Sequence, residues 1–206
     1  MALVKLNNRG VRSATTFGSI TGLGSMVFIK KQTASSSATI SFVDGTSDVV
    51  LDDTYKEYLF TFNNIHPATN NTTFDFNISI DSGSNYNVAK TTTFFRTQHG
   101  ENDAGAELGY ETGMDLAQGT GVQNITQSTG NGNDESSSGY LHLFNPSSTT
   151  FVKHFIATSC SYQGSDYQYQ SFVGGYGNTT SAVDAIQFSM SSGNIDAGDI
   201  CLYGIN

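Results

Sequence analysis

The chain of 206 residues is poor in several residue types, and each shortage excludes a class of protein. It has no tryptophan, two prolines, two cysteines and nine basic residues against eighteen acidic ones. Two cysteines cannot form the disulfide framework of a small secreted domain, so we expect Cys160 and Cys201 to be free, buried thiols. No apolar run approaches the ~18 residues of a membrane span, and the first residues lack the apolar core of a secretory signal. The net charge of −9 disfavours nonspecific nucleic-acid binding. We therefore expect no membrane insertion and no nucleic-acid partner.

The residues that are abundant indicate many short strands. There are 14 Phe, 10 Tyr and 22 Gly, and the turn segments are rich in Ser, Asn and Gly. The clearest pattern is "TFDFNISI" at 73–80, where apolar and polar residues alternate strictly, as in a half-buried strand. We predict strands at 25–31, 39–43, 55–62, 73–80, 91–97, 139–144, 150–159, 167–174, 184–190 and 199–204. With no helical pattern between them, they predict an all-β protein: a jelly-roll-like β-sandwich with an extended N-terminal arm.

Charge is divided unevenly along the chain. Before Asp44 there are five basic residues and no acidic one, namely Lys5, Arg9, Arg12, Lys30 and Lys31. From Asp44 onward there are four basic residues and all eighteen acidic ones, which gives this part a charge of −14. We predict that residues 1–31 form a basic docking arm and that residues 32–206 form an acidic body. The alternative is a frayed tail that only keeps the chain soluble.

One long segment interrupts the strand pattern. Residues 99–137 are rich in Gly, Asn and acids and poor in apolar anchors, so we predict a long acidic loop that is functional or ordered by a partner. Its oxygen-rich side chains suit Ca²⁺, but the spaced motif D-x-[DN]-x-[DN]-G is absent. Solvated acidic loops are the simpler interpretation, and we predict no metal site.

The segment "GYLHLFNPSSTTFVKHFIA" at 139–157 is apolar on both sides of a turn and has a histidine on each arm. A four-residue turn at 145–148 would pair His142 with Phe151, so His142 and His154 would point to opposite faces and could not share a metal. A hairpin that is apolar on both faces needs cover on both. We predict that four aromatic residues meet either the core or a second subunit: Tyr140, Phe144, Phe151 and Phe155.

Nothing in the sequence predicts catalysis or a cofactor. There is no G-x-S-x-G, P-loop or HExxH motif, and no spacing singles out a pair of glycosidase carboxylates. Four tyrosines among Gln and Gly residues are the main candidates for ligand binding: Tyr162, Tyr167, Tyr169 and Tyr176. Their rings could stack on a sugar or a protein while the hydroxyls form hydrogen bonds. The alternative is that they pack in the sandwich or at a subunit contact.

Several segments resemble structural proteins of tailed bacteriophages, especially marine ones. The resemblance lies in "MALVKLNNRGV", "SATISFVDG", "FNNIHPATNNTTFDF", "LHLFNPSSTTFVKHF" and "TTSAVDAIQFSMSSGNIDAGDICLYGI", and it runs over most of residues 1–206. It implies a non-enzymatic oligomeric β-domain, commonly a trimer, in a virion assembled in the host cytoplasm.

On this basis we expect a capsid decoration or cement protein, a head fibre or knob, or a tail component. Its N-terminal arm would hold other virion proteins. The alternative is a tail-fibre head that binds a receptor or a host surface glycan.

Overall fold

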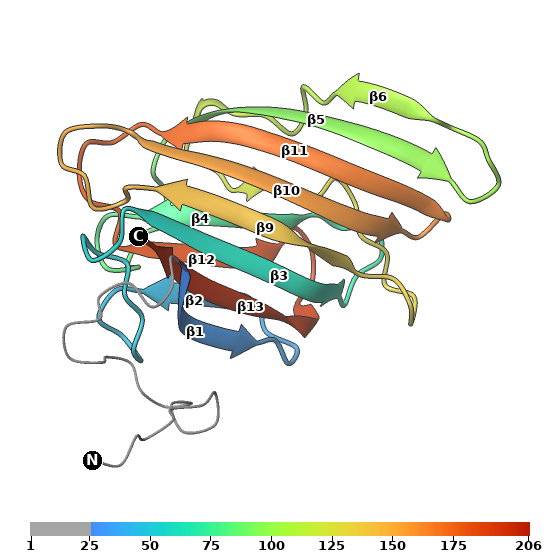
Figure 1. Cartoon of the computed structure of the whole chain (residues 1–206). Coiled ribbons are helices and arrows are strands. Elements are labelled where there is room, and N and C mark those ends of the chain that lie inside the picture. The colour runs from blue at the N-terminus through green and yellow to red at the C-terminus, as the bar shows by residue number, and fades with distance from the viewer. Residues whose placement is uncertain (1–25) are drawn as a thin grey trace, which may run out of the picture.

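The computed structural model describes residues 26–206, and this part of the chain consists of strands and connections without a helix (Figure 1). The strands form two antiparallel sheets, one of nine strands and one of four. Apolar side chains from both sheets form a single core, so the described chain is a β-sandwich and the predicted all-β class is confirmed. Lys5, Arg9 and Arg12 of the predicted arm lie outside the described residues.

The large sheet is built in the order β1-β13-β3-β9-β10-β11-β5-β6, and β7 also pairs with β5. The bounds of its strands are β1 (Met26–Thr33), β3 (Glu57–Pro67), β5 (Lys90–Gly100), β6 (Glu107–Tyr110), β7 (Ala117–Gly119), β9 (Ser137–Phe144), β10 (Lys153–Gln163), β11 (Tyr167–Gly177) and β13 (Ile195–Ile205). The small sheet has the order β2-β12-β4-β8, with β2 (Thr39–Val43), β4 (Phe74–Ser79), β8 (Gln123–Asn124) and β12 (Ala185–Met190).

Strand pairing is nested along the chain. The first strand β1 pairs with the last, β13, and β2 pairs with β12. Further in, β3 pairs with β9 and β4 with β8. Successive pairs alternate between the sheets, so the chain forms one long antiparallel ribbon that is wound around the core. The strands β5 to β7 and β10 to β11 are additions that widen the large sheet (Figure 1).

Aromatic rings fill the space between the sheets. The ring of Phe188 in β12 lies 5.4 Å from that of Phe62, 5.5 Å from Phe60 and 5.6 Å from Phe74, measured between centroids. These rings are completely or almost completely buried, so the hydrophobic effect of burying them is a main source of stability. The alternation at 73–80 correctly identifies the core-facing side of β4, since Phe74, Phe76 and Ile78 are buried.

The other side of β4 differs from the expectation. Asp75, Asn77 and Ser79 are buried as well, although the alternating pattern predicts a side that faces water. The segment after β7 accounts for part of this cover, because Asn124 of β8 pairs with Asp75 and the Thr120 carbonyl accepts a hydrogen bond from Asn77. Residues 99–137 are therefore not one long loop. They contain β6, β7 and β8, and Ile125 lies in the core.

The predicted register of the hairpin at 139–157 is wrong. The connection between β9 and β10 runs over 145–152, and His142 pairs with Ile156 instead of Phe151. This is a slip of an odd number of residues, so it reverses the face on which β10 places each side chain. His154 therefore points to the same side of the sheet as His142, away from the core.

The N-terminal boundary also lies earlier than the composition indicates. Residues 26–31 of the predicted arm, which include Lys30 and Lys31, belong to β1, an edge strand of the large sheet. The described body thus begins at Met26.

Candidate functional site

The large sheet has one face that no other described part of the chain covers as a layer. Side chains alternate along its strands, so the neighbours of core residues such as Phe60, Leu141 and Phe155 point away from the small sheet. We call this side the outer face. Figure 1 shows it as a broad, gently twisted surface that extends from β1 to β6.

Two adjacent cross-strand rows run through the middle of the outer face, and together we call them the central belt. The first row consists of Phe28, Tyr203, Leu59, His142, Ile156, Gly174 and Thr93. The second row consists of Cys201, Thr61, Tyr140, Thr158, Phe172, Phe95 and Tyr110. At its β1 end the second row reaches Lys31, which pairs with Cys201 and whose Nζ lies 3.1 Å from Asp199 Oδ2. From β13 to β6 the central belt contains no Asp, Glu, Lys or Arg, although the body around it is strongly acidic.

Large apolar groups of the central belt are open to solvent. The exposed fraction is 56% for Phe28, 51% for Ile156, 52% for Tyr110 and 43% for Tyr140. Single exposed apolar residues are ordinary on protein surfaces, but a contiguous patch marks a surface that binds something. Here the cross-strand pairing makes the patch contiguous across eight strands of the sheet.

A shallow depression lies near the β5 side of the central belt. Its volume is about 280 Å³, and its walls include Phe95, Ile156 and Phe172. The rings of Phe95 and Phe172 are stacked with centroids 4.8 Å apart. Gly174 lowers the floor because it has no side chain, and a Cβ placed there would come no closer than 3.8 Å to Thr93 Oγ1. The site therefore has unused room above the backbone.

Both edges of the large sheet are protected against strand addition. β1 carries Lys30 and Lys31 and has an irregular register between Phe28 and Lys30. β6 has only four residues and begins at Glu107. Charges, irregular pairing and short length are features by which sheets avoid edge-to-edge association. The outer face is thus available for contact, whereas the edges are not.

The positive charges of the body are largely neutralised or hidden. The side chains of Lys90 and Lys153 are fully buried. The guanidinium of Arg96 lies between two carboxylates, with Nε 2.7 Å from Glu111 and Nη2 3.6 Å from Glu107. Among the body residues after Asp44, only Lys56 presents a free positive charge to solvent, so the surface outside the central belt is dominated by acids.

Three buried ionisable groups have shifted pKa values. Burial lowers the pKa of Lys90 to about 8, and Nζ donates hydrogen bonds to Asn77 Oδ1 at 2.5 Å and the Val88 carbonyl at 2.9 Å. Burial also lowers the pKa of Lys153, whose Nζ donates to the carbonyl of Phe151. Burial removes water from the carboxylate of Asp75 and raises its pKa to about 6, although a hydrogen bond from Asn124 acts in the opposite direction. None of the three lines the central belt, so we assign them to the fold.

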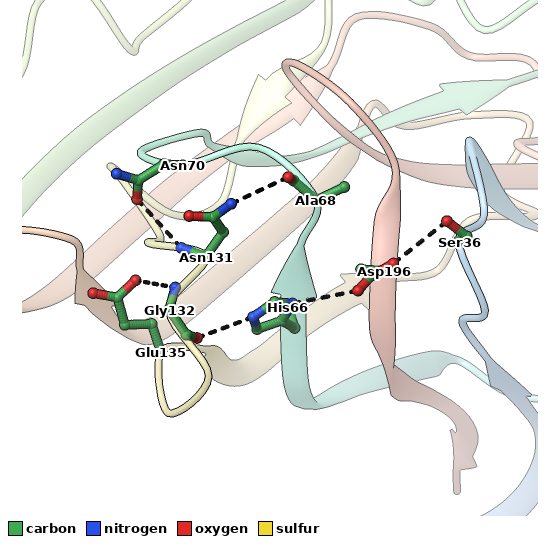
Figure 2. A network of polar contacts seen from close by, with 8 residues as sticks. All are labelled: Ser36, His66, Ala68, Asn70, Asn131, Gly132, Glu135 and Asp196. Atoms are coloured by element: carbon green, nitrogen blue, oxygen red, sulfur yellow. Dashed lines mark hydrogen bonds and ion pairs between the residues drawn. The ribbon is translucent and has the colours of Figure 1, made fainter.

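A polar network joins several connections at one end of the sandwich (Figure 2). His66 Nε2 donates to the Gly132 carbonyl at 3.1 Å, and its Nδ1 lies 3.9 Å from Asp196 Oδ2. The backbone N–H of Gly132 donates to Glu135. Ser36 Oγ donates to the other oxygen of Asp196 at 3.4 Å. The imidazole thus ties β3 to β13 and to the connection before β9.

Beside this network lies an open polar groove in two parts that meet at Ser136. One part has a volume of about 490 Å³ and is lined by Asn64, His66, Asn133, Asp134, Glu135, Ser136 and Ala197. The other has about 380 Å³ and is lined by Glu101, Ser136, Ser138, Cys160, Ser161, Tyr162 and Gln168. Carboxylates, amides and hydroxyls without Lys or Arg suit a neutral or cationic ligand rich in hydroxyl groups. Because Nε2 of His66 is held by a carbonyl, the groove offers no free imidazole base.

The four predicted ligand-binding tyrosines do not form one surface. Tyr162 lines the polar groove, and its hydroxyl donates to Asp166 Oδ1 at 3.2 Å. Tyr176 lies on the outer face beside His154, with ring centroids 6.0 Å apart. Tyr167 and Tyr169 point to the opposite side of β11, where the Tyr169 ring faces the guanidinium of Arg96.

The four predicted contact aromatics also separate. Phe155 belongs to the core, whereas Tyr140 and Phe144 point to the outer face. Phe151 is 69% exposed in the connection before β10, where it lines a pocket of about 500 Å³ together with Phe144 and His154. The remainder of the central belt comes from β1, β3, β5, β6, β11 and β13. Sequence reasoning missed it, although the apolar residues on both sides of 55–62 were a signal.

The cysteines and acids show no sign of a metal site. Both thiols are free, and Cys201 is buried as expected, but Cys160 is exposed on the outer face, so the prediction of burial is wrong for that residue. Among residues 26–206, no group of three His, Cys, Asp or Glu side chains is arranged to hold a metal ion. No helix in this part of the chain is long and apolar enough to cross a membrane.

Comparisons with models of protein families, with curated proteins and with solved structures gave no match. The candidate sites are therefore judged on their own geometry. The central belt is the broader of the two and joins the most strands, and the polar groove is the one whose lining includes carboxylates.

Proposed function

We propose that the protein is a non-enzymatic structural protein of a tailed-phage virion, an oligomeric β-sandwich that is held on the particle by its N-terminal segment. The observation that carries this proposal is the central belt. An uncharged, partly aromatic surface on an otherwise acidic body fits permanent contact with protein and is poorly suited to water. The resemblance of the sequence to phage structural proteins supplies the kind of particle.

The strand order supports the same proposal. Nested pairing of β1 with β13, β2 with β12, β3 with β9 and β4 with β8 is compatible with the jelly roll that we propose, in which β5 to β7 and β10 to β11 would be insertions. Jelly rolls are frequent in viral capsid domains and also in lectins. A fold alone does not define a function, so this agreement adds to the argument from the surface and does not replace it.

The N-terminal segment is the proposed attachment. Lys5, Arg9 and Arg12 precede β1 without an acidic residue among them. A basic segment of this kind suits an acidic neighbour in the particle. Because the described body begins at Met26, removal of residues 2–24 leaves in place every strand that the structure describes.

Labelled particles and a truncation test the proposal together. Antibodies raised against the recombinant chain should decorate virions in electron micrographs, on the capsid or on the tail. The chain without residues 2–24 should fold with an unchanged far-ultraviolet spectrum but should not join particles assembled in infected cells. Normal incorporation of the truncated chain would refute the attachment. Unlabelled particles whose protein content lacks the chain would refute the virion assignment.

The polar groove favours one second candidate, a receptor- or glycan-binding head. Glu135, Ser136 and Tyr162 lie along a groove whose polar atoms could bind sugar hydroxyls. We expect binding to a glycan array or host cells in this case, and its loss in Glu135→Ala and Tyr162→Ala. The matched control is Tyr176→Ala, which changes a tyrosine outside the groove. No binding by the intact chain on either platform would exclude this candidate.

A further inference from the structure

We infer that the occupant of the central belt is a second copy of this chain, which packs its own central belt face to face against the first. This inference rests on the proposed structural function and names the partner for one surface. It is argued from the charge of the body, from the area of the outer face and from the state of the sheet edges.

Charge distinguishes a second copy from other protein partners. Two copies of an acidic body repel each other wherever their carboxylates meet, and they can approach closely only through a surface without charges. The central belt is such a surface, and it is a continuous one. A partner of opposite charge would be recognised through carboxylates that are free to pair with it. On the outer face, the carboxylate of Glu57 already lies 2.9 Å from Nε2 of His142 in the belt, and Asp199 and Lys31 lie at the β1 side. Lys31 and Asp199 are moreover already paired with each other at 3.1 Å.

The area of the outer face is sufficient for a stable pair of subunits. Eight strands about 4.8 Å apart are about 38 Å wide, and four rows spaced about 6.7 Å apart add about 27 Å in the other direction. The central belt with one flanking row on each side therefore covers about 1,000 Å², against about 800 Å² per partner in a typical stable interface. The part of one flanking row formed by Ser138, Cys160, Gln170 and Thr97 is uncharged, and the flanking row on the other side contains one carboxylate, that of Glu57.

The sheet edges direct the contact to this face. β1 presents two lysines and an irregular register, and β6 is short and lies beside acids, so neither edge offers a regular partner for another strand. Sheets that pack face to face lie about 10 Å apart with interdigitating side chains. The depression over Gly174 can accept a side chain from the facing sheet, and the exposed Ile156 beside it can fill such a depression on the partner.

Gly174→Arg tests the inference on the full-length chain. The new side chain rises from an unoccupied position, so the monomer should fold, but it places an unpaired charge in the middle of the interface. Thr39→Arg is the matched control, because Thr39 is an exposed strand residue on the outward side of the small sheet and the change of charge is the same. Ile156→Asp is a second interface variant at an exposed residue.

Sedimentation equilibrium between about 1 and 100 μM should show the wild-type chain and Thr39→Arg as a dimer, with twice the chain mass of 22.0 kDa. Gly174→Arg and Ile156→Asp should weaken association by about 100-fold or more, with thermal unfolding of the monomer unchanged. Circular dichroism verifies that each variant is folded.

Three results would overturn the inference. The first is a wild-type chain that stays monomeric over the whole concentration range. If such a monomer binds particles through the belt, another virion protein is the occupant. The second is an oligomer that Gly174→Arg and Ile156→Asp leave intact. The third is association by the chain without residues 2–24 when the full-length chain stays monomeric. That result would show that the belt is covered by the N-terminal segment of the same chain. If the protein is monomeric in solution but antibodies label the virions, only the inference of a second copy is refuted. If the protein forms oligomers but is absent from virions, only the virion assignment is refuted.

Discussion

The fully buried Lys90 should make the stability of the fold depend on pH in a defined way. Its Nζ is enclosed with two neutral acceptors, Asn77 Oδ1 and the Val88 carbonyl, and no carboxylate is bonded to it. Lys90→Met keeps most of the volume of the side chain and removes the charge. Replacing a buried charge with an apolar group of similar size is often neutral or stabilising.

The magnitude follows from the pKa. Burial lowers the pKa of Lys90 from 10.5 to about 8 in the folded protein. Below pH 8 the amine is protonated in both states, and its burial costs the fold about 3 kcal/mol at ~1.36 kcal/mol per pH unit. Between pH 8 and 10.5 the unfolded chain keeps a proton that the folded chain has lost, so stability rises with pH. Above 10.5 the cost is absent.

The assay is urea unfolding at pH 7, 8.5 and 10, with free energies compared between the wild type and Lys90→Met at each pH. We expect the advantage of Lys90→Met to be largest at pH 7 and to shrink by about 2–3 kcal/mol towards pH 10. Other titrating groups contribute to both proteins and cancel in the difference. Lys56→Met is the control, because it makes the same substitution at a lysine that faces solvent and leaves the interior unchanged. A constant difference for Lys90→Met would refute the reasoning.

Three further predictions concern the fold. Burial raises the pKa of Asp75 to about 6, so Asp75→Asn should stabilise the protein by up to about 3 kcal/mol above pH 6. This advantage should be lost as the pH falls to 3.8. Equal effects of the substitution at pH 4 and pH 8 in urea unfolding would contradict the prediction. Gly175→Ala should lower the free energy of unfolding by about 1–3 kcal/mol, since a Cβ there would lie 2.6 Å from the Thr91 carbonyl oxygen. Gly174→Ala should be tolerated, because its Cβ would have room. Similar melting temperatures for the two variants would argue against the packing described. Phe188→Ala should cost about 3–5 kcal/mol through loss of its ring contacts, and a cost below 1 kcal/mol in chemical unfolding would show that the core is not centred on this ring.

Strands were predictable from the sequence where the side chains that face the core alternate with polar ones. The alternation around Phe74 and Phe76 marks a strand because apolar side chains must reach the core on every second residue. The short strands within 99–137 were not predictable in this way. β8 has two residues, and Gln123 and Asn124 give no periodic signal. They form a strand because β4 provides a partner, which is a tertiary effect.

Register limited the prediction of the candidate site. The turn at 145–148 has good turn residues, but the chain continues to 152 before β10 begins, and Asn145 donates its backbone N–H to the Lys56 carbonyl. A contact with a distant strand therefore decided where the hairpin closes. The central belt could not be read from sequence, because Phe28, Leu59 and Tyr203 become neighbours only through pairings between distant segments.

The pairing of the first described strand with the last affects how the protein can be made. β13 lies between β1 and β3, and among the described strands β1 pairs with β13 alone. While the chain emerges from the ribosome, β1 has no partner until residues 195–205 have been translated, and the strands of the β2–β12 pair are nearly as far apart in the sequence. Contacts of such long sequence separation fold slowly. The sandwich therefore closes only after β13 has been translated, and a chain that stops before Ile195 loses the strand that joins β1 to β3 in the large sheet.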